Sequence, residues 1–250
     1  MNLALVIPCH GRYELTEIGL DQKLWLQECV RNADPAHDVQ LQVFVVSEDD
    51  KHKAMAEARG FRFVPSDNSA LGKRWNDGYQ EAANEDYDMA MPCGSDSWLH
   101  PELFYWLPWW STKVITVTTL YSLVEPTGKW RSDIEIIPKL HPFGVGFIWN
   151  LYLAREIGWR PCAEQIARGC DTSTLNALIA QGGELHHVRH RHLEYVAFQS
   201  GKQITNVRKI TARHQGQIVA PALDGLRELY PPALVDRVAD YYKSGRSRIN

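Results

Sequence analysis

The sequence predicts an α/β fold, with a mostly parallel central sheet and helices on both of its faces. Two observations lead to this expectation. Short apolar segments alternate with segments of helical periodicity through the first part of the chain. Each early apolar segment also ends in small and polar residues, as strands of an open parallel sheet do. With 250 residues, 44% of them hydrophobic, the chain can bury a substantial core in one large domain or two small ones.

The first strands and helices follow directly from this alternation. Residues 3–7 form a continuous apolar run that Pro8 closes, which is typical of a buried parallel strand. Residues 16–31 carry apolar side chains at helical spacing, and Asp34-Pro35 ends that segment. In chain order, the expected elements are strand 3–7, helix 16–31, strand 39–46, helix 51–59, strand 61–64, helix 72–83 and strand 88–91.

In the second half of the chain, strand and helix patterns alternate less regularly. Residues 101–110 are rich in Trp and Pro, and we prefer a cover packed over the sheet to a platform for stacking sugars. A glycine-punctuated strand over 143–148 indicates either the close approach of a ligand or a bulge. The further expected elements are strand 113–124, a returning hairpin strand 130–137, helices 151–157 and 171–181, strand 184–188, and one or two helices over 221–242 broken at Pro231-Pro232.

Charge and cysteine content limit the function classes. The formal net charge of -3 gives no overall attraction to nucleic acid or anionic membranes. Locally, residues 186–214 carry an excess of positive charge, which is either a solvated face or a phosphate-binding surface. The five cysteines are widely spaced without a CxxC pair, which argues against a disulfide framework or a zinc site. No targeting signal or membrane span is visible, so we expect a cytoplasmic protein.

Three polar clusters follow expected strands, at 9–12, 47–50 and 94–97. Because ligands of open α/β sheets bind outside the carboxyl ends of the strands, we expect these clusters to converge. Asp96, in a Gly-Ser-Asp turn, is either a metal ligand at this edge or the cap of an ordinary surface turn, and we expect the turn to be exposed. Asp171 is either a catalytic acid or the N-cap of its helix.

Several of these segments together resemble the GT-A glycosyltransferases of the family 2 type. The resemblance is carried by Val-Ile-Pro-Cys-His-Gly-Arg, Val-Val-Ser-Glu-Asp-Asp, Leu-Gly-Lys-Arg-Trp-Asn-Asp-Gly-Tyr and Met-Pro-Cys-Gly-Ser-Asp-Ser-Trp, in that order, and covers roughly residues 3–200. The most similar members are the short single-domain enzymes of bacteriophages. The resemblance implies a GT-A fold with a small antiparallel hairpin. We expect one catalytic domain over 1–215, with a nucleotide-binding half (1–98) and an acceptor-side half (99–215), and a helical C-terminal extension over 216–250.

The resemblance also implies roles for individual residues. Gly94 stands where the metal-binding Asp-x-Asp motif of the family has its first acid, so only Asp96 remains of that pair. A histidine after the last core strand completes the metal shell in some members, and of His186, His187, His190 and His192 we select His190. The implied assignments are Asp171 as the catalytic base; Pro8, His10, Arg12, Asp49, Lys73, Asn76 and Ser95 for the nucleotide; Asp96 and His190 for the metal; and Gly144, Gly146 and Trp98 on the acceptor side.

The implied function is that of an inverting hexosyl- or pentosyltransferase. It uses a nucleotide-diphosphate sugar, with UDP as the expected nucleotide and Mn²⁺ or Mg²⁺ as the cofactor. The acceptor is a hydroxyl, either on a hydroxymethylated base of phage DNA bound through 186–214 in the host cytoplasm, or on a glycan, lipid or protein. Two alternatives remain. A nucleotidyltransferase is disfavoured by the single glycine in the loop 8–12, and a non-catalytic nucleotide-sugar-binding protein is favoured by the missing first acid.

Overall fold

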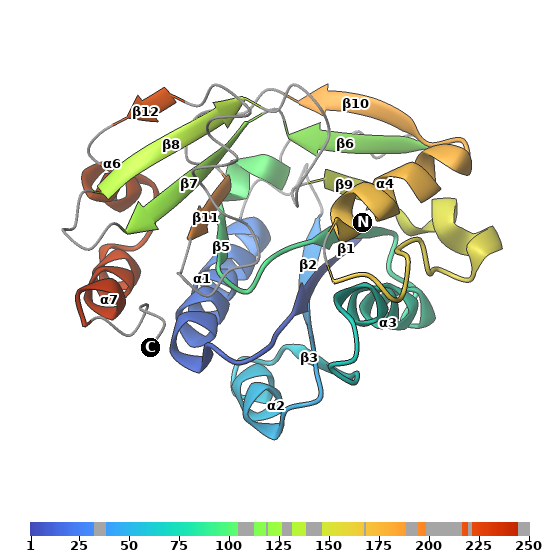
Figure 1. The fold of residues 1–250 in the computed structure, drawn as a ribbon, viewed down its shortest axis with the longest axis horizontal. Helices are drawn as coiled ribbons and strands as arrows, with labels where there is room; N and C mark the ends of the chain where they lie inside the picture. Colours follow the sequence, from blue (N-terminus) through green and yellow to red (C-terminus); the bar gives the residue numbers. More distant parts are fainter. Residues whose placement is uncertain are drawn as a thin grey trace.

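The computed structural model describes residues 1–32, 39–104, 113–118, 120–126, 132–138, 147–167, 169–188, 195–198, 217–219 and 222–244. A seven-stranded sheet in the order β10-β6-β9-β4-β1-β2-β3 forms the centre (Figure 1). The strand β1 (Asn2–Pro8) lies between β2 (Gln40–Ser47) and β4 (Met89–Pro92), parallel to both, and β3 (Arg62–Pro65) extends the parallel part. The predicted α/β fold class with a mostly parallel sheet is thereby confirmed.

The far half of this sheet contains the one antiparallel strand. The strand β9 (Phe147–Asn150) runs antiparallel to both β4 and β6 (Val114–Thr118), and β10 (Glu184–Val188) pairs parallel with β6. The expected strand over 184–188 therefore has the predicted bounds. Of the glycine-punctuated strand expected over 143–148, the structure describes residues 147 and 148 as the start of β9, and the two glycines lie outside the described residues.

Helices cover both faces of the sheet, as the alternating pattern predicts (Figure 1). On one face α1 (Tyr13–Arg31) and α2 (Asp50–Glu57) pack over Leu3, Leu5 and Ile7. On the other face α3 (Leu71–Asn84) and α4 (Cys170–Ala180) pack over Ala4 and Val6. Successive side chains of β1 thus enter opposite apolar clusters, because side chains alternate across a strand. Two 3₁₀ turns are also present, η2 (Pro101–Phe104) and η3 (Leu151–Ile157), and η3 lies where a helix is expected.

The small antiparallel hairpin that the sequence predicts is part of a second sheet. This sheet has five strands in the order β12-β8-β7-β11-β5. The expected hairpin is present as β7 (Leu120–Pro126) and β8 (Ser132–Pro138), and β5 (Ser97–Leu99), β11 (Tyr195–Phe198) and β12 (Gln217–Val219) enlarge it. The single strand expected over 113–124 is wrong, since β6 and β7 belong to different sheets. No glycine or proline separates them, so the sequence carries no mark of the change.

The C-terminal helices pack against the first helix, α1. Two helices, α6 (Ala222–Leu229) and α7 (Pro232–Lys243), flank the predicted proline break. The cluster around α7 includes Leu15 and Ile18 of α1. The described helices of the segment expected as an extension thereby share a core with α1. None of the helices in the described ranges is both long enough and apolar enough to cross a membrane.

Candidate functional site

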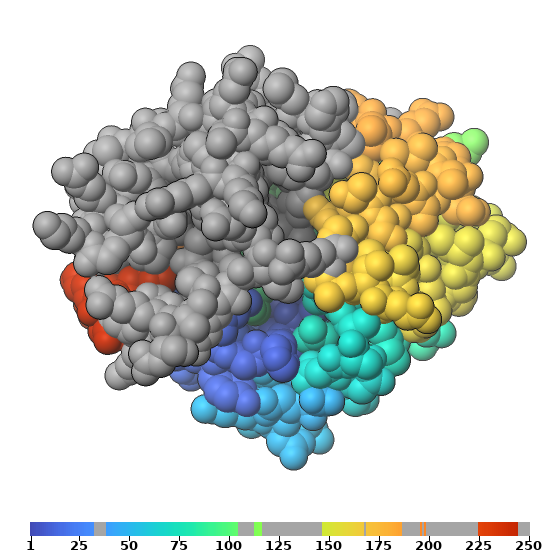
Figure 2. All heavy atoms as spheres, viewed as in Figure 1, coloured from blue at the N-terminus to red at the C-terminus, as the bar shows by residue number. Residues whose placement is uncertain are grey.

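The loops that follow β1, β2 and β4 start side by side at one edge of the central sheet. Hydrogen bonds join the first loop residues to the neighbouring strands: the amide of Cys9 donates to the carbonyl of Val46, and that of Cys93 to the carbonyl of Val6, both at 2.9 Å. The predicted convergence of the three polar clusters follows from this register. Figure 2 shows the surface hollowed where the blue atoms near the chain start, the teal atoms of α3 and the gold atoms around α4 come together.

The loops after β1 and β4 are joined by an ion pair. One guanidinium nitrogen of Arg12 (Nη1) lies 2.7 Å from Asp96 Oδ2, and the other (Nη2) lies 3.5 Å from Ser95 Oγ. Both Gly11 and Arg12 have left-handed backbone conformations, with φ of 56° and 43°. For a non-glycine residue this conformation is uncommon and is found at functional sites more often than elsewhere. The structure thus brings together Arg12, Ser95 and Asp96 as the sequence predicts.

Asp96 is buried, with 8% of its surface exposed, so the expectation of an exposed turn is wrong. The turn lies deep because Gly19 lets it approach α1. A Cβ atom at Gly19 would lie 2.0 Å from the carbonyl oxygen of Ser95, which is closer than any real contact. Any other residue there would push the turn away from the helix.

Two buried polar side chains of α1 hold the strand that follows this turn. The ammonium group of Lys23 donates to the carbonyl of Ser97 and to Oε1 of Gln22, and Gln22 Nε2 donates to the carbonyl of Leu99 at 2.7 Å. Burial lowers the pKa of Lys23. Sequence reasoning missed both residues, although polar side chains at apolar positions of a predicted helix were a visible signal.

Among the described residues, Asp96 is paired with Arg12 rather than grouped with further metal ligands. A hard cation takes about six oxygen ligands, of which the protein often supplies one or two carboxylates, and here one Asp96 oxygen is already bound to the Arg12 guanidinium. The other, Oδ1, would lie 2.7 Å from a Cβ atom at Gly94, so an acid at that position would require the Asp96 side chain to shift. In the part of the chain that the structure describes, no three or more His, Cys, Asp or Glu side chains are grouped to hold a metal. His190 lies outside that part.

Asp49 lies at the carboxyl end of β2 and has two structural contacts. Its Oδ1 accepts a hydrogen bond from the amide of Lys51 at 2.8 Å, which caps α2, and its Oδ2 accepts one from the hydroxyl of Tyr13. The hydrogen bond from Tyr13 and the one from the Lys51 amide lower the pKa of Asp49. Its side chain is 26% exposed, so the carboxylate still reaches the surface beside the loop after β1.

That same corner contains a buried histidine. His52 Nδ1 lies 2.9 Å from Ser47 Oγ, and Nε2 lies 3.3 Å from the carbonyl oxygen of Gly11. Burial lowers the pKa of His52, which favours the neutral ring. These contacts tie the start of α2 to the loop after β1, and so fix Asp49 relative to that loop.

Arg74 is a site residue that sequence reasoning missed in favour of its neighbour Lys73. Its Nη1 donates to the carbonyl of Cys9 at 3.0 Å, it is only 8% exposed, and its Nε has no hydrogen-bond partner among the described residues. Burial lowers the pKa of Arg74, which identifies a charge taken out of water. Helical phase was the available signal. Gly78 follows Arg74 by one turn and packs on Val6 of the sheet. Arg74 therefore lies on the side of α3 that faces the sheet.

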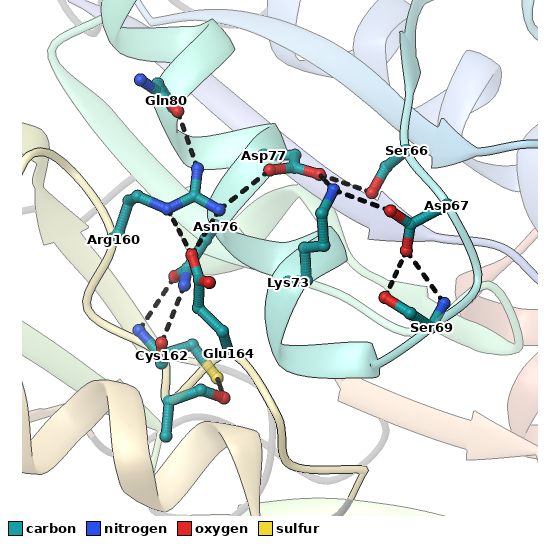
Figure 3. Close-up of polar contacts among 11 residues, drawn as sticks. Ser66, Asp67, Ser69, Lys73, Asn76, Asp77, Gln80, Arg160, Cys162 and Glu164 are labelled. Carbon is teal, nitrogen blue, oxygen red and sulfur yellow. Dashed lines mark hydrogen bonds and ion pairs between the residues drawn. The ribbon is translucent and has the colours of Figure 1, made fainter.

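Lys73 is engaged elsewhere, in a network that joins α3 to the segment before α4 (Figure 3). Its ammonium group lies 2.7 Å from Asp77 Oδ2 and 3.4 Å from Asp67 Oδ2. Arg160 contacts the other oxygen of Asp77 at 3.1 Å and donates from Nε to Glu164 at 2.6 Å. The hydrogen bond to Asp77 is the largest cause of the raised pKa of Lys73.

Asn76 binds the same segment by a second route. Its side chain is fully buried, donates to the carbonyl of Cys162 at 2.7 Å and accepts from the amide of Cys162 at 2.9 Å (Figure 3). Gly72 permits the contact, because a Cβ there would lie 2.1 Å from the carbonyl oxygen of Ala163. The amide of Ala163 in turn donates to Ser173 Oγ in the first turn of α4. Asn76 therefore positions the start of α4 rather than facing an open surface.

Asp171 is the second residue of α4 and is partly exposed. The N-cap of this helix is Gly169, in the left-handed region at φ 71°, so the alternative role of Asp171 as N-cap is wrong. A carboxylate in the first helical turn is stabilised by the helix dipole.

The other predicted site residues lie in different surroundings. Trp98 is 1% exposed and packs on Phe198 and Tyr230, with ring centroids 4.8 and 5.2 Å away. Pro8 ends β1, and His10 is exposed in the loop that follows. Gly144, Gly146, and most of the basic stretch 186–214 lie outside the described residues.

The fold is similar to that of solved glycosyltransferase structures. S. aureus TarS 1-349 in complex with UDP has a TM-score of 0.53 at 12% identity, covering 80% of this chain and 61% of that chain. The same protein in complex with UDP-GlcNAc has a TM-score of 0.51 at 12% identity, with coverage of 81% and 60%. This chain has a GT-A type fold. A third structure of TarS 1-349 agrees, with a TM-score of 0.52 at 14% identity over 79% of this chain and 60% of that chain.

This chain spans about 60% of the length of the TarS structures that it resembles. A scan against protein-family models finds no match, and a search of curated protein sequences finds none either. The predicted GT-A architecture is therefore confirmed at the level of fold. The bacteriophage kind of enzyme remains a prediction from the sequence.

Proposed function

We propose that this chain is a glycosyltransferase that uses a UDP-sugar as donor. The observation that carries the proposal is Arg74, a buried guanidinium beside the loop after β1 whose Nε has no hydrogen-bond partner among the described residues. No described carboxylate forms an ion pair with it, and burying a charge in this way costs several kcal/mol, so a bound anion would stabilise it. A diphosphate at the carboxyl edge of a GT-A sheet supplies that anion. Two TarS structures of similar fold, each 12% identical in sequence to this chain, contain UDP-GlcNAc or UDP. These ligands favour a nucleotide sugar over other anions.

The donor would lie across the three converging loops. Asp49, at the end of β2, presents a partly exposed carboxylate that can accept hydrogen bonds from the base or the ribose. Arg12 and Ser95, at the ends of β1 and β4, lie where the diphosphate would follow. Pro8 and His10 line the first of these loops. Along the sheet edge, the base and ribose would thus lie at the end of β2 and the diphosphate at the ends of β1 and β4.

Asp171 is the proposed base of an inverting transfer. It would accept the proton of the acceptor hydroxyl while that oxygen forms a bond to the anomeric carbon. The bond between the anomeric carbon and the diphosphate oxygen breaks at the same time, and UDP leaves with the electron pair. The sugar is a hexose or a pentose. The position of Asp171 at the start of α4, fixed through Asn76 and the segment 160–166, supports this role.

The proposed acceptor is a hydroxymethylated base in DNA, bound through the basic stretch 186–214. Binding of this kind weakens steeply as salt rises, because phosphate contacts release counterions. Measuring DNA binding at increasing salt tests the assignment. If no DNA binds at low salt, a glycan or protein acceptor replaces it.

The test of the proposal is calorimetric titration with UDP, followed by hydrolysis and transfer assays with UDP-sugars. Arg74→Met is expected to weaken UDP binding about 10-fold or more, whereas Arg62→Met, an exposed arginine paired with Glu85 on β3, leaves it unchanged. Asp171→Asn is expected to reduce turnover roughly 100-fold or more and to leave UDP affinity unaltered. Binding of UDP without turnover of any UDP-sugar would instead support the non-catalytic binding protein.

A further inference from the structure

We infer that the Arg12 guanidinium takes the place of the divalent cation in this chain, so that the donor diphosphate binds without a metal. The inference rests on the proposed function and concerns the same site. It departs from the expectation of Mn²⁺ or Mg²⁺ at Asp96, and three features of the described residues support it.

The first feature is the ion pair itself. The guanidinium of Arg12 and the carboxylate of Asp96 are 2.7 Å apart, and their side chains are 24% and 11% exposed. Burying a carboxylate is costly unless an opposite charge compensates it, and Arg12 supplies such a charge. A cation that bound Asp96 Oδ2 would have to displace Arg12 from a hydrogen bond of good length.

The second feature is Gly94, where the family motif has its first acid. The Asp96 carboxylate folds back over this residue, so that a Cβ atom there would lie 2.7 Å from Asp96 Oδ1 and 2.8 Å from Ser97 Oγ. A side chain at position 94 would therefore make the Asp96 carboxylate shift from the place where it pairs with Arg12, and glycine leaves that place open. The missing first acid and the ion pair are consistent with one arrangement.

The third feature is the unused capacity of Arg12. A guanidinium carries five N–H donors, and the contacts to Asp96 and Ser95 engage one on each terminal nitrogen. The remaining donors, on a side chain that reaches the surface, suit phosphate oxygens in a forked geometry. The left-handed backbone at Arg12 fixes where this group points. Together with Arg74, which like Arg12 acts on Cys9 electrostatically, it would supply positive charge for a departing diphosphate.

The experiment is calorimetric titration of the full chain with UDP, once in EDTA and once with saturating Mn²⁺. We expect the two dissociation constants of the wild type to agree within about 3-fold, and Arg12→Met to weaken binding in EDTA about 10-fold or more. Arg12→Lys, which keeps the charge and loses the fork, is expected to fall between them. Arg62→Met is the matched control, since it removes an exposed arginine far from the loops.

The outcomes separate this inference from the proposed function. If the wild type binds UDP with Mn²⁺ and not in EDTA, the inference is overturned while the glycosyltransferase proposal stands. If UDP binds in neither condition, both are overturned. The wild-type comparison needs no variant, so it decides the question even if Arg12→Met fails to fold.

Discussion

The ion pair between Arg12 and Asp96 makes a quantitative prediction about stability. Arg12→Met leaves Asp96, 11% exposed at its side chain, without its counterion. Removing one partner of a buried pair costs about 3–5 kcal/mol, and we expect about 3 kcal/mol because Arg12 itself is 24% exposed. Asp96→Asn leaves only the more exposed guanidinium unpaired, so its cost is smaller, about 1–2 kcal/mol.

A double-mutant cycle tests this estimate. Once Asp96 is neutral, loss of Arg12 removes little more than packing of its stem, so the double variant is expected to be only slightly less stable than Asp96→Asn. The coupling free energy from urea denaturation should then be about 2 kcal/mol. Additivity of the two single variants within about 0.5 kcal/mol would refute the reasoning, because it would show that the two charges do not stabilise one another.

Three further predictions concern the contacts that hold the site. Gly19→Ala should lower stability by about 1–3 kcal/mol in thermal denaturation, because its Cβ would overlap the Ser95 carbonyl; unchanged stability would mean that the turn has room. Asn76→Ala should cost about 2–4 kcal/mol, because the buried amide and carbonyl of Cys162 lose their partners, and should reduce transfer more than UDP affinity; equal losses of both would contradict a positioning role. Burial alone would raise the pKa of Asp77, but hydrogen bonds from its neighbours outweigh it, and the pKa lies below the ordinary 3.8. A lowered carboxyl pKa stabilises the fold above the unfolded pKa, so this contribution should disappear as the pH falls below about 4 in urea denaturation, and Asp77→Asn should flatten that loss.

The parallel half of the fold could be predicted because its signals are local. The apolar run that Pro8 ends gives β1, the stop at Gly60 gives the end of α2, and the helical repeat gives α1 and α3. The second sheet could not be predicted in the same way. Its strands come from positions far apart in the chain, and the passage from β6 to β7 occurs within one run of β-favouring residues. Only tertiary pairing decides where such a run divides.

The candidate site shows the same division between local and long-range signals. The three loops were predictable because parallel strands end at a common edge. The pairing of Arg12 with Asp96 joins residues 84 positions apart, and no spacing rule reports it. The burial of Asp96 depends on Gly19, a lone helical glycine whose purpose appears only when the turn lies against it. A polar turn at a strand end looks exposed in sequence for that reason.

Lys73 and Arg74 show how closely function depends on helical phase. The two residues are adjacent and both cationic, yet successive residues of an α-helix point about 100° apart. Lys73 faces the side on which Asp77 follows one turn later, and its charge is balanced there. Arg74 shares its face with Gly78, which touches the sheet, and its charge is buried beside Cys9 without such a carboxylate partner in the described chain. The proposed anionic ligand is therefore expected to meet Arg74, the residue whose charge is not balanced by a carboxylate on the same face.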